Sequence, residues 1–445
     1  MEENKLKGYL WNVANEYRAI THAGNIIPAL IRFIFIKYVI DNYLFANDVE
    51  VMKLYATAQK YLSGRSDDAA EGFVNAVSPI LENIDVNLDV GGSLARASSL
   101  YYDDLLGKYN KKKSFYSSPA VAILEMFSSF DFQDIDREKL YDCLSSLIHD
   151  QAQRTGRYGG EYITSDSLNK LAKSLLCVSD KEVVRDFACG YGLSGLSVTN
   201  GTNAKLILSD ISEENIQIAI MLNVIAGKYD TKYELGNSLY RTDNEKLADV
   251  IYTDFPLNLK LFDEDREIYH TNSGNIAAIY RTLEMLKPNG RAVITCPGNV
   301  LFGNSRDAKS LRMDLLVSGS LKAVITLPTL MYGTTVNVNV LVLSKTDNKK
   351  ITFINASTND VFQFSNKARG ADVELTDEGI AKIASIVNEK QDIPGISKNV
   401  ASYLMASGKS LVPVTYIENV ERDKSLSSKE ITEQLEDLYK ELTKL

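Results

Sequence analysis

The chain has 445 residues, of which 45% are hydrophobic and 24% charged, and its formal net charge is −9. This length predicts two or three domains, each able to bury its own core, and the ordinary composition excludes a largely disordered or fibrous protein. The acidic balance argues against a protein that grips nucleic acid alone over a broad surface, although a local basic patch or a basic partner subunit can supply phosphate contacts.

Residues 1–150 are predicted to form a helical domain, because apolar positions recur at helical spacing between short polar breaks. The most apolar run, Ile26–Phe45, is interrupted by proline and charged residues, so it contains no stretch of about 18 uncharged apolar residues. We therefore expect a buried helix there and not a membrane span. The first residues, Met-Glu-Glu-Asn-Lys, do not resemble a signal peptide.

Residues 151–348 alternate between strand-like and helix-like patterns, which predicts an α/β fold with a Rossmann-like, doubly wound parallel sheet. The strand-like segments are 183–188, 205–209, 233–235, 250–253, 291–296, 323–327 and 338–344. Residues 349–422 are predicted to extend this core with mixed α/β structure. The four cysteines form no C-x-x-C pair and the three histidines lie far apart, so we expect no zinc site and a reduced, cytoplasmic setting.

Residues 423–445 are predicted to form a single C-terminal helix with an apolar seam. Its apolar side chains follow one another at alternating four- and three-residue steps, namely Ile431, Leu435, Leu438, Leu442 and Leu445. This spacing is typical of a heptad repeat, and an isolated helix of this length is marginal in water. We expect the seam to pack either on its own chain or on a helix of another subunit.

A glycine-rich turn, Asp186-Phe-Ala-Cys-Gly190-Tyr-Gly192, lies between the first predicted strand and a predicted helix. Glycine suits such a turn because the backbone must bend sharply and let a ligand approach closely. With Gly195 the turn also satisfies the G-x-G-x-x-G pattern of dinucleotide-binding folds, and Asp210 lies about 20 residues on, where a ribose-binding acid belongs.

Asp186 favours one of two nucleotide-like ligands for this turn. Its carboxylate would face a pyrophosphate unfavourably, whereas it can pair with the ammonium group of S-adenosylmethionine, which carries no phosphate. Asp210 suits either ligand and does not discriminate between them. A third interpretation is that the glycines only close a strand–helix turn and bind nothing.

The tetrapeptide Asp254-Phe255-Pro256-Leu257 follows a predicted strand and therefore lies at the carboxyl edge of the sheet, where open α/β folds bind ligands. Methylation of an exocyclic amine requires its lone pair to be drawn out of ring conjugation. An acid or amide side chain and a backbone carbonyl can do this by accepting both amine protons, while an aromatic face holds the flipped base.

Several ordered motifs between Gly159 and Lys345 resemble those of the modification subunit of type I restriction-modification systems. Gly160-Glu-Tyr-Ile-Thr-Ser165 resembles the family's G-E-F-Y-T-P motif, and the glycine-rich turn resembles its D-P-A-C-G-S-G. The segments 285–294, 297–302 and 325–328 resemble the strand-and-loop series after the catalytic motif. The resemblance extends to the N-terminal helical region and to the C-terminal helix.

This resemblance implies a DNA adenine-N6 methyltransferase that uses S-adenosylmethionine as its cofactor. It implies that the cofactor is bound by Tyr162, Thr164, Asp186, Ala188, Gly190, Gly192, Asp210 and Asn237. Asp210 would bind the ribose, and Asn237 would lie beside the adenine in a segment that the family writes as G-D-S-L. The implied partners are DNA, a specificity subunit that reads the target sequence and contacts the C-terminal helix, a second modification subunit and a nuclease subunit.

The predicted catalytic motif departs from the family's N-P-P-F or N-P-P-Y. Asp254 keeps an acceptor for the amine, and the carbonyl of Phe255 can supply the second, but the first proline and the aromatic residue at Leu257 are absent. Two hypotheses follow. In the first, the chain is a working methyltransferase in which the Phe255 ring substitutes for the missing aromatic; in the second, it is a non-catalytic subunit that binds DNA, cofactor or a specificity partner in a host-defence complex.

Overall fold

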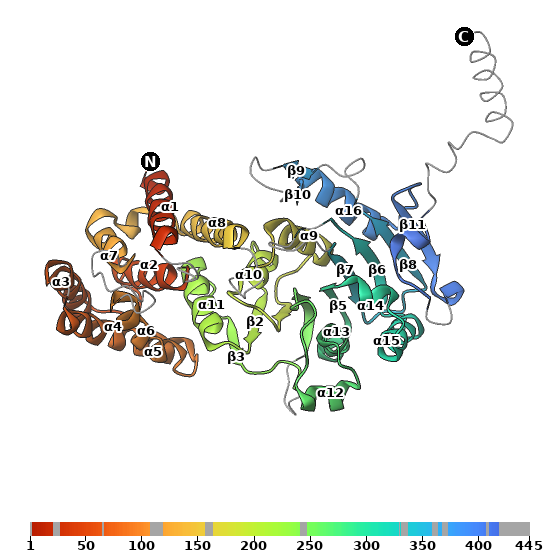
Figure 1. Ribbon diagram of the computed structural model, residues 1–445, viewed down its shortest axis with the longest axis horizontal. Helices are drawn as coiled ribbons and strands as arrows, with labels where there is room; N and C mark the ends of the chain where they lie inside the picture. The colour runs from red at the N-terminus through yellow and green to blue at the C-terminus, as the bar shows by residue number, and fades with distance from the viewer. Residues whose placement is uncertain are drawn as a thin grey trace, which may run out of the picture.

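The computed structural model describes most of the chain in several stretches. These are residues 2–20, 27–64, 66–106, 119–155, 163–240, 247–328, 330, 337–357, 364–366, 373–405 and 409–417. A helical part lies at one end of the molecule and a large sheet, flanked by helices, lies at the other (Figure 1). The candidate functional residues lie in the sheet part.

The N-terminal part is helical, as its apolar spacing predicts. Its helices are α1 (Glu2–Ile20), α2 (Ile27–Asp41), α3 (Asp48–Gly64), α4 (Asp67–Leu88), α5 (Ser93–Arg96), α6 (Ser98–Leu106), α7 (Pro119–Ser129) and α8 (Arg137–Thr155), with a 3-10 turn at Phe132–Asp134. Every residue of α2 is buried, which confirms the expected buried helix. Within the described ranges, no helix is long and apolar enough to cross a membrane.

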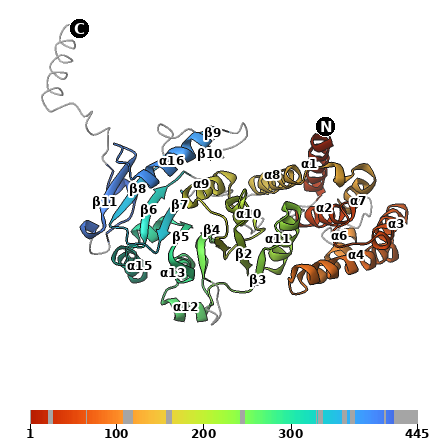
Figure 2. The same cartoon turned by 180° about the vertical axis from the view of Figure 1, so that it is seen from behind.

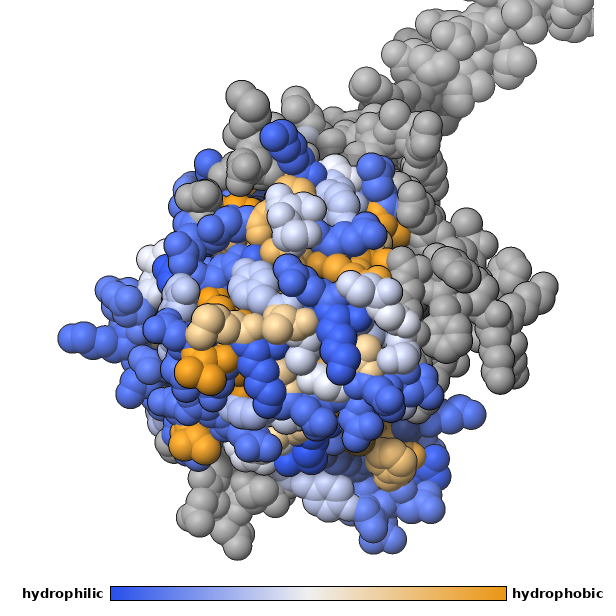
Figure 3. All heavy atoms as spheres, turned by 90° about the vertical axis from the view of Figure 1, so that its left-hand side faces the viewer, coloured by the Kyte–Doolittle hydropathy of each residue, from blue (hydrophilic) through white to orange (hydrophobic). Residues whose placement is uncertain are grey.

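Charged residues inside α2 are buried together with partners of opposite charge. Arg32 Nε donates to Asp104 Oδ2 at 2.8 Å, and Lys37 Nζ donates to Asp41 Oδ2 at 2.6 Å. Such pairing is what allows charged groups to lie in an apolar interior. The outer end of the helical part presents mostly hydrophilic side chains with apolar ones interspersed, as expected of a solvated surface (Figure 3).

The sheet has nine strands in the order β11-β8-β6-β7-β5-β4-β1-β2-β3. They are β1 (Val183–Asp186), β2 (Lys205–Asp210), β3 (Lys232–Leu235), β4 (Ala248–Thr253), β5 (Leu286–Cys296), β6 (Leu321–Thr326), β7 (Asn339–Ser344), β8 (Lys350–Asn355) and β11 (Ser397–Ala401). The block from β3 to β5 is parallel, whereas β7 is antiparallel to both of its neighbours. This topology confirms the predicted Rossmann-like, doubly wound α/β fold.

Strands β1 and β4 are neighbours in the sheet. The chain continues from β1 to β2 and β3 on one side and from β4 to β5 on the other, so the strand order reverses between β1 and β4. Open α/β folds bind ligands at the carboxyl ends of the strands where this reversal occurs. Asp186 ends β1, and Asp254 directly follows β4. The topology therefore brings the two predicted motifs side by side.

Helices cover both faces of the sheet. One face is covered by α9 (Asp166–Leu176), α10 (Leu193–Thr199), α11 (Glu213–Ala226) and α16 (Asp377–Glu389). The other is covered by α13 (Gly274–Met285), α14 (Gly298–Phe302) and α15 (Arg306–Val317), with α12 (Asp263–Tyr269) beside α13. A separate two-stranded sheet, β9 (Phe364–Asn366) and β10 (Val373–Leu375), lies near α16 (Figure 1).

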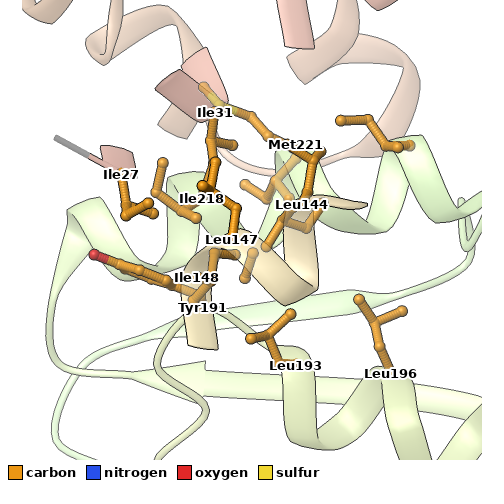
Figure 4. Close-up of a cluster of buried hydrophobic side chains, with 14 of the residues drawn as sticks. Ile27, Ile31, Leu144, Leu147, Ile148, Tyr191, Leu193, Leu196, Ile218 and Met221 are labelled. Carbon is orange, nitrogen blue, oxygen red and sulfur yellow. The ribbon is translucent and has the colours of Figure 1, made fainter. Parts of the chain in front are cut away.

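The helical part and one face of the sheet share a single apolar core. Helix α11 packs against α2 and α8, an arrangement that is also visible from behind (Figure 2). In the close-up, Ile31 of α2 lies beside Ile218 of α11, while Leu147 and Ile148 of α8 lie beside Tyr191 in the glycine-rich turn (Figure 4). The helical part thereby supports the turn directly.

Candidate active site

The glycine-rich turn has a backbone that requires glycine at Gly192. Its φ is +79°, and a Cβ there would lie 3.0 Å from Leu208 Cδ1 and 3.1 Å from Ala219 Cβ. Gly190 also has a positive φ, of +51°, but a Cβ there would meet nothing within 4 Å. Gly192 therefore serves close packing between turn, strand and helix, while the space in front of Gly190 is open to a ligand.

Asp186, the predicted methionine-end contact, is only 1% exposed, and its Oδ1 accepts a hydrogen bond from the Ala188 backbone N–H at 3.2 Å. Burial raises the pKa of this carboxyl to about 7, and the nearby carboxylates Asp210 and Asp254 contribute to the increase. Three acids thus surround one small region. A cationic ligand would relieve their mutual repulsion, so the donor set fits a molecule with a positively charged centre.

Asp210 connects the turn to the end of β2. Its Oδ2 accepts the Gly190 backbone N–H at 2.9 Å, while Oδ1 accepts Ser212 N at 2.8 Å and Asn215 Nδ2 at 3.2 Å. A carboxylate oxygen can accept more than one hydrogen bond, so Asp210 can still accept hydrogen bonds from ribose hydroxyls, as predicted.

Asn237, which follows β3, is held in place by hydrogen bonds to its neighbours. Its Nδ2 donates to both carboxylate oxygens of Asp265, at 3.1 and 2.9 Å, and its Oδ1 accepts Leu239 N at 3.1 Å. Asp265 is buried in α12. The amide thus stabilises α12, and an aspartate at this position would face Asp265 with like charge. That Asn237 lies beside the cofactor adenine stays a prediction. Tyr162, another predicted cofactor contact, lies outside the described residues.

Asp254 accepts hydrogen bonds from two threonine hydroxyls. Thr164 Oγ1 donates to its Oδ2 at 2.7 Å, and Thr295 Oγ1, from the end of β5, donates to its Oδ1. Burial raises the pKa of Asp254, whereas the bonds from Thr295 and Thr164 oppose the increase by favouring the ionised form. The two hydroxyls therefore fix the orientation of the carboxylate and help to keep it charged.

One pocket joins the predicted cofactor residues to the predicted catalytic acid. It is lined by Ile163, Thr164, Ala188, Cys189, Gly190, Tyr191, Leu193, Ser194, Asn215 and Asp254. Thr164, predicted as a cofactor contact, lies in this pocket but directs its hydroxyl at Asp254. His149 of α8 supports Thr164 from the helical part, with its Nε2 3.0 Å from the Thr164 carbonyl oxygen.

The loop after Asp254 is fixed by the core beneath it and by α13. Phe255 is 5% exposed, and its ring centroid lies 5.9 Å from that of Phe187. This ring is therefore enclosed in the core and does not present a face to a flipped base, contrary to the suggestion that it replaces the missing aromatic. Leu257 is half-buried against the core on the other face.

Asn275 is a second support that the sequence did not reveal. This α13 side chain is 1% exposed, donates from Nδ2 to the Pro256 carbonyl at 3.3 Å and accepts the Asn258 backbone N–H at 2.9 Å. It therefore holds the backbone on both sides of Leu257. No donor among the described residues reaches the Phe255 carbonyl, which is left available as an acceptor.

Comparisons with known proteins agree with this arrangement. The family model described as N-6 DNA Methylase matches residues 136–424. The chain is 25% identical over 436 residues to the methylase subunit of the type I restriction enzyme MjaVIII from Methanocaldococcus jannaschii, covering 90% of this chain and 73% of that protein. It is 22% identical over 383 residues to the methylase subunit of MpnII from Mycoplasma pneumoniae, covering 76% and 68%.

A solved structure shows the same fold. The methyltransferase subunit of a type I restriction-modification system from Streptococcus thermophilus superposes with a TM-score of 0.71 at 18% identity, covering 94% of this chain and all of that one. The family model spans more than half of the chain and includes the glycine-rich turn, Asp254 and both of its threonine partners. The resemblance expected from the sequence is confirmed: the chain belongs to the N-6 DNA methylase family.

Proposed function

We propose that the chain is the methylase subunit of a type I restriction-modification system and transfers a methyl group from S-adenosylmethionine to the N6 amino group of adenine in DNA. The observation that carries this proposal is the carboxylate of Asp254, oriented by Thr164 and Thr295 in the same pocket as the turn at Gly190. A subunit that only binds DNA or a partner has no need of an oriented carboxylate there.

The residues around the pocket suit this cofactor, which supplies a methyl group on a positively charged sulfur. Asp186, Asp210 and Asp254 provide the negative potential that a sulfonium and an ammonium require. Gly190 leaves space for close approach, and Asp210 can accept from ribose hydroxyls with its remaining lone pairs. We assign Asp186, Ala188, Gly190 and Asp210 to cofactor binding on this basis, while Gly192 shapes the turn by close packing and Thr164 lines the pocket and orients Asp254.

Asp254 and the Phe255 carbonyl orient the adenine amine. Each accepts one amine N–H, which draws the nitrogen lone pair out of conjugation with the ring and aims it into the cofactor pocket. The carboxylate oxygens retain this capacity although each already accepts a threonine hydroxyl, because a carboxylate offers about four acceptor sites. The nitrogen that has gained the methyl group is strongly acidic and loses its extra proton to water, so the role of Asp254 is to orient the amine.

The target adenine has no aromatic side chain to stack on at Leu257, where the resembled motif has Phe or Tyr. Leu257 offers an aliphatic contact, and stacking on an aromatic face is worth roughly 1–3 kcal/mol per base. We therefore infer weaker capture of the flipped base, and not a loss of the chemical step, because the two acceptors of the amine are in place.

We further propose that DNA sequence is read by a specificity subunit that binds the C-terminal helix through Ile431, Leu435, Leu438 and Leu442, which lie outside the described residues. A second methylase copy and a nuclease subunit complete the expected assembly, in the cytoplasm. The acidic net charge of the chain supports dependence on a partner for broad DNA contact.

Methyl transfer can be tested with the full chain co-purified with its specificity subunit. Methyl-labelled cofactor and unmethylated DNA are added, and label in the DNA is followed with time. Turnover with label on adenine supports the proposal. Cofactor binding without any labelled adenine, in a complex that binds DNA, would instead support the non-catalytic subunit.

A further inference from the structure

A cavity of about 1130 Å³ opens next to the catalytic loop, between α12, α13 and α15. Its lining begins at Asn258, directly after the catalytic tetrapeptide, and at Asn299 in α14. These segments leave the carboxyl ends of β4 and β5, so the cavity opens on the same edge of the sheet as Asp254.

The cavity wall is attached to the catalytic loop by direct contacts. Asn275 binds both the Pro256 carbonyl and the Asn258 N–H, which fixes where the lining begins relative to Asp254. Lys260 is then aligned by an isolated antiparallel bridge with Ser273, at the start of α13. A ligand in the cavity therefore lies in a defined position relative to the catalytic acid.

The side chains that line the cavity carry a net positive charge, although the protein as a whole is acidic. Lys260 and Arg306 both line it and are exposed, and neither forms an ion pair with any residue in the described part of the chain. A third cation, Arg266, has Asp263 as its one ion-pair partner among the described residues, and because Asp263 is 92% exposed this pair is weak.

Both acids that line the cavity, Asp307 and Glu284, already have partners within the protein. Asp307 accepts the Thr271 hydroxyl at 2.5 Å and the Ala308 N–H at 2.9 Å, and it lies in the first turn of α15, where the helix dipole stabilises negative charge. Glu284 lies 3.7 Å from Arg281. Among the described residues, the charges in the lining without an ion pair are therefore two cations, Lys260 and Arg306, and one hydrogen-bonded acid, Asp307, which leaves a net positive charge.

The remaining lining is rich in hydrogen-bonding groups, including the amides of Asn258 and Asn299 and the hydroxyl of Ser310. Such a surface is unsuited to an apolar ligand. It suits phosphate oxygens, which accept hydrogen bonds from amides, hydroxyls and cations. The start of α15, at Ser305 and Arg306, adds the positive end of a helix dipole.

We propose that this cavity binds the phosphodiester backbone of the DNA strand that carries the target adenine, on one side of the flipped base. The inference rests on the proposed function and adds a DNA-positioning site within an otherwise acidic subunit. Holding the phosphates next to the flipped nucleotide fixes the register of the strand over Asp254, because phosphate contacts set position and orientation.

The test uses the full chain in complex with its specificity subunit and the variants Lys260→Gln, Arg306→Gln and their combination. Lys205→Gln is the matched control, since Lys205 is exposed at the start of β2, on the opposite edge of the sheet. Affinity for a short fluorescent, unmethylated duplex is measured over a range of salt concentrations, and cofactor affinity is measured separately by calorimetry.

Each cavity substitution is expected to weaken DNA binding by roughly three- to tenfold and to reduce the slope of log affinity against log salt by about one. Cofactor affinity stays unchanged, and Lys205→Gln changes none of these quantities. An unchanged DNA affinity and slope in the double variant, beside a wild type that binds and methylates DNA, overturns the inference alone. So does loss of the specificity subunit with intact DNA binding, since the cavity would then contact protein. A wild-type complex that neither binds nor methylates DNA overturns the proposed function and this inference with it.

Discussion

The ring centroids of Phe187 and Phe255 lie 5.9 Å apart, and this contact joins the cofactor turn to the catalytic loop. Both residues occupy places where the resembled motifs, D-P-A-C-G-S-G and N-P-P-F, have proline. The two substitutions of proline by phenylalanine are therefore linked in the structure. Where each proline would stiffen the backbone by itself, the two phenylalanine rings pack against each other. This pair, with Asn275, explains how Asp254 is positioned without the first proline.

Removing either ring is expected to destabilise the protein and to slow methyl transfer. Phe187→Ala or Phe255→Ala each leaves a cavity in the core, at a cost of about 3–5 kcal/mol. The double variant should cost about 0.5–1.5 kcal/mol less than the sum of the two, because the contact is lost only once. Urea-unfolding midpoints and methyl-transfer rates of all three variants measure this coupling.

Phe353 provides a matched control for that experiment. It is fully buried on β8, where it stacks on Tyr416 away from the pocket. Phe353→Ala should lower stability similarly but leave the methyl-transfer rate per folded molecule unchanged. Strictly additive losses for Phe187 and Phe255, or an equal loss of rate in Phe353→Ala, would count against a linked pair.

The hydroxyl of Thr295 is expected to tune the charge of Asp254. Thr295→Val keeps the shape of the side chain but removes a hydrogen bond to the carboxylate, so the pKa of Asp254 should rise further. The acidic limb of the pH–rate profile should then move to higher pH, and kcat should fall roughly 10- to 100-fold, the worth of one bond to a charged group.

Thr295→Ser keeps the hydroxyl and is the control for that profile. Its acidic limb should stay at the wild-type position. If Val and Ser variants have the same profile as the wild type, Thr295 has only a packing role.

Cofactor affinity is expected to depend on pH through Asp186. In the ligand-free protein its pKa is raised from 3.8 to about 7, and a bound cation favours the ionised form. Binding therefore releases a proton below pH 7, so affinity should increase by up to about tenfold per pH unit as the pH rises toward 7 and should level off above it. Calorimetric titration at several pH values measures this dependence.

The same shift has a consequence for stability. Because the folded pKa of Asp186 lies above the unfolded value, the stability that this group contributes is complete below pH 3.8 and is lost as the pH rises through about 7. Asp186→Asn should thus stabilise the ligand-free chain at neutral pH, weaken cofactor binding and flatten its pH dependence. A pH-independent affinity in the wild type would show that Asp186 does not sense the bound cation.

The sequence alone was sufficient for the fold and for the meeting of the two motifs. Alternating apolar runs predict the strands, glycines mark the turn, and the carboxyl ends of parallel strands necessarily share one edge, which places Asp186 and Asp254 together. These are local signals or rules of topology.

The supports of the catalytic loop depend on register and tertiary packing, which single-sequence patterns do not contain. Thr295 reaches Asp254 because Thr253 of β4 pairs with Ile294 of β5, and a shift of one residue would turn its side chain to the other face. Asn275 reaches Pro256 only after the intervening residues fold back as α12 and the start of α13. The hydrogen bond from Asn237 to Asp265 likewise depends on how α12 folds back toward the sheet.

The central claim is that Asp254 orients the adenine amine for methyl transfer, and substitution at this one position tests it most directly. N6-methyladenine formed by the complex with its specificity subunit is quantified by mass spectrometry for the wild type, Asp254→Asn and Asp254→Ala, with cofactor and DNA binding checked for each. We predict methyladenine from the wild type and from Asp254→Asn, which keeps an acceptor oxygen, and at least about a hundredfold less from Asp254→Ala with both ligands still bound. Equal methylation by Asp254→Ala, or none by a wild type that binds both ligands, would contradict the account.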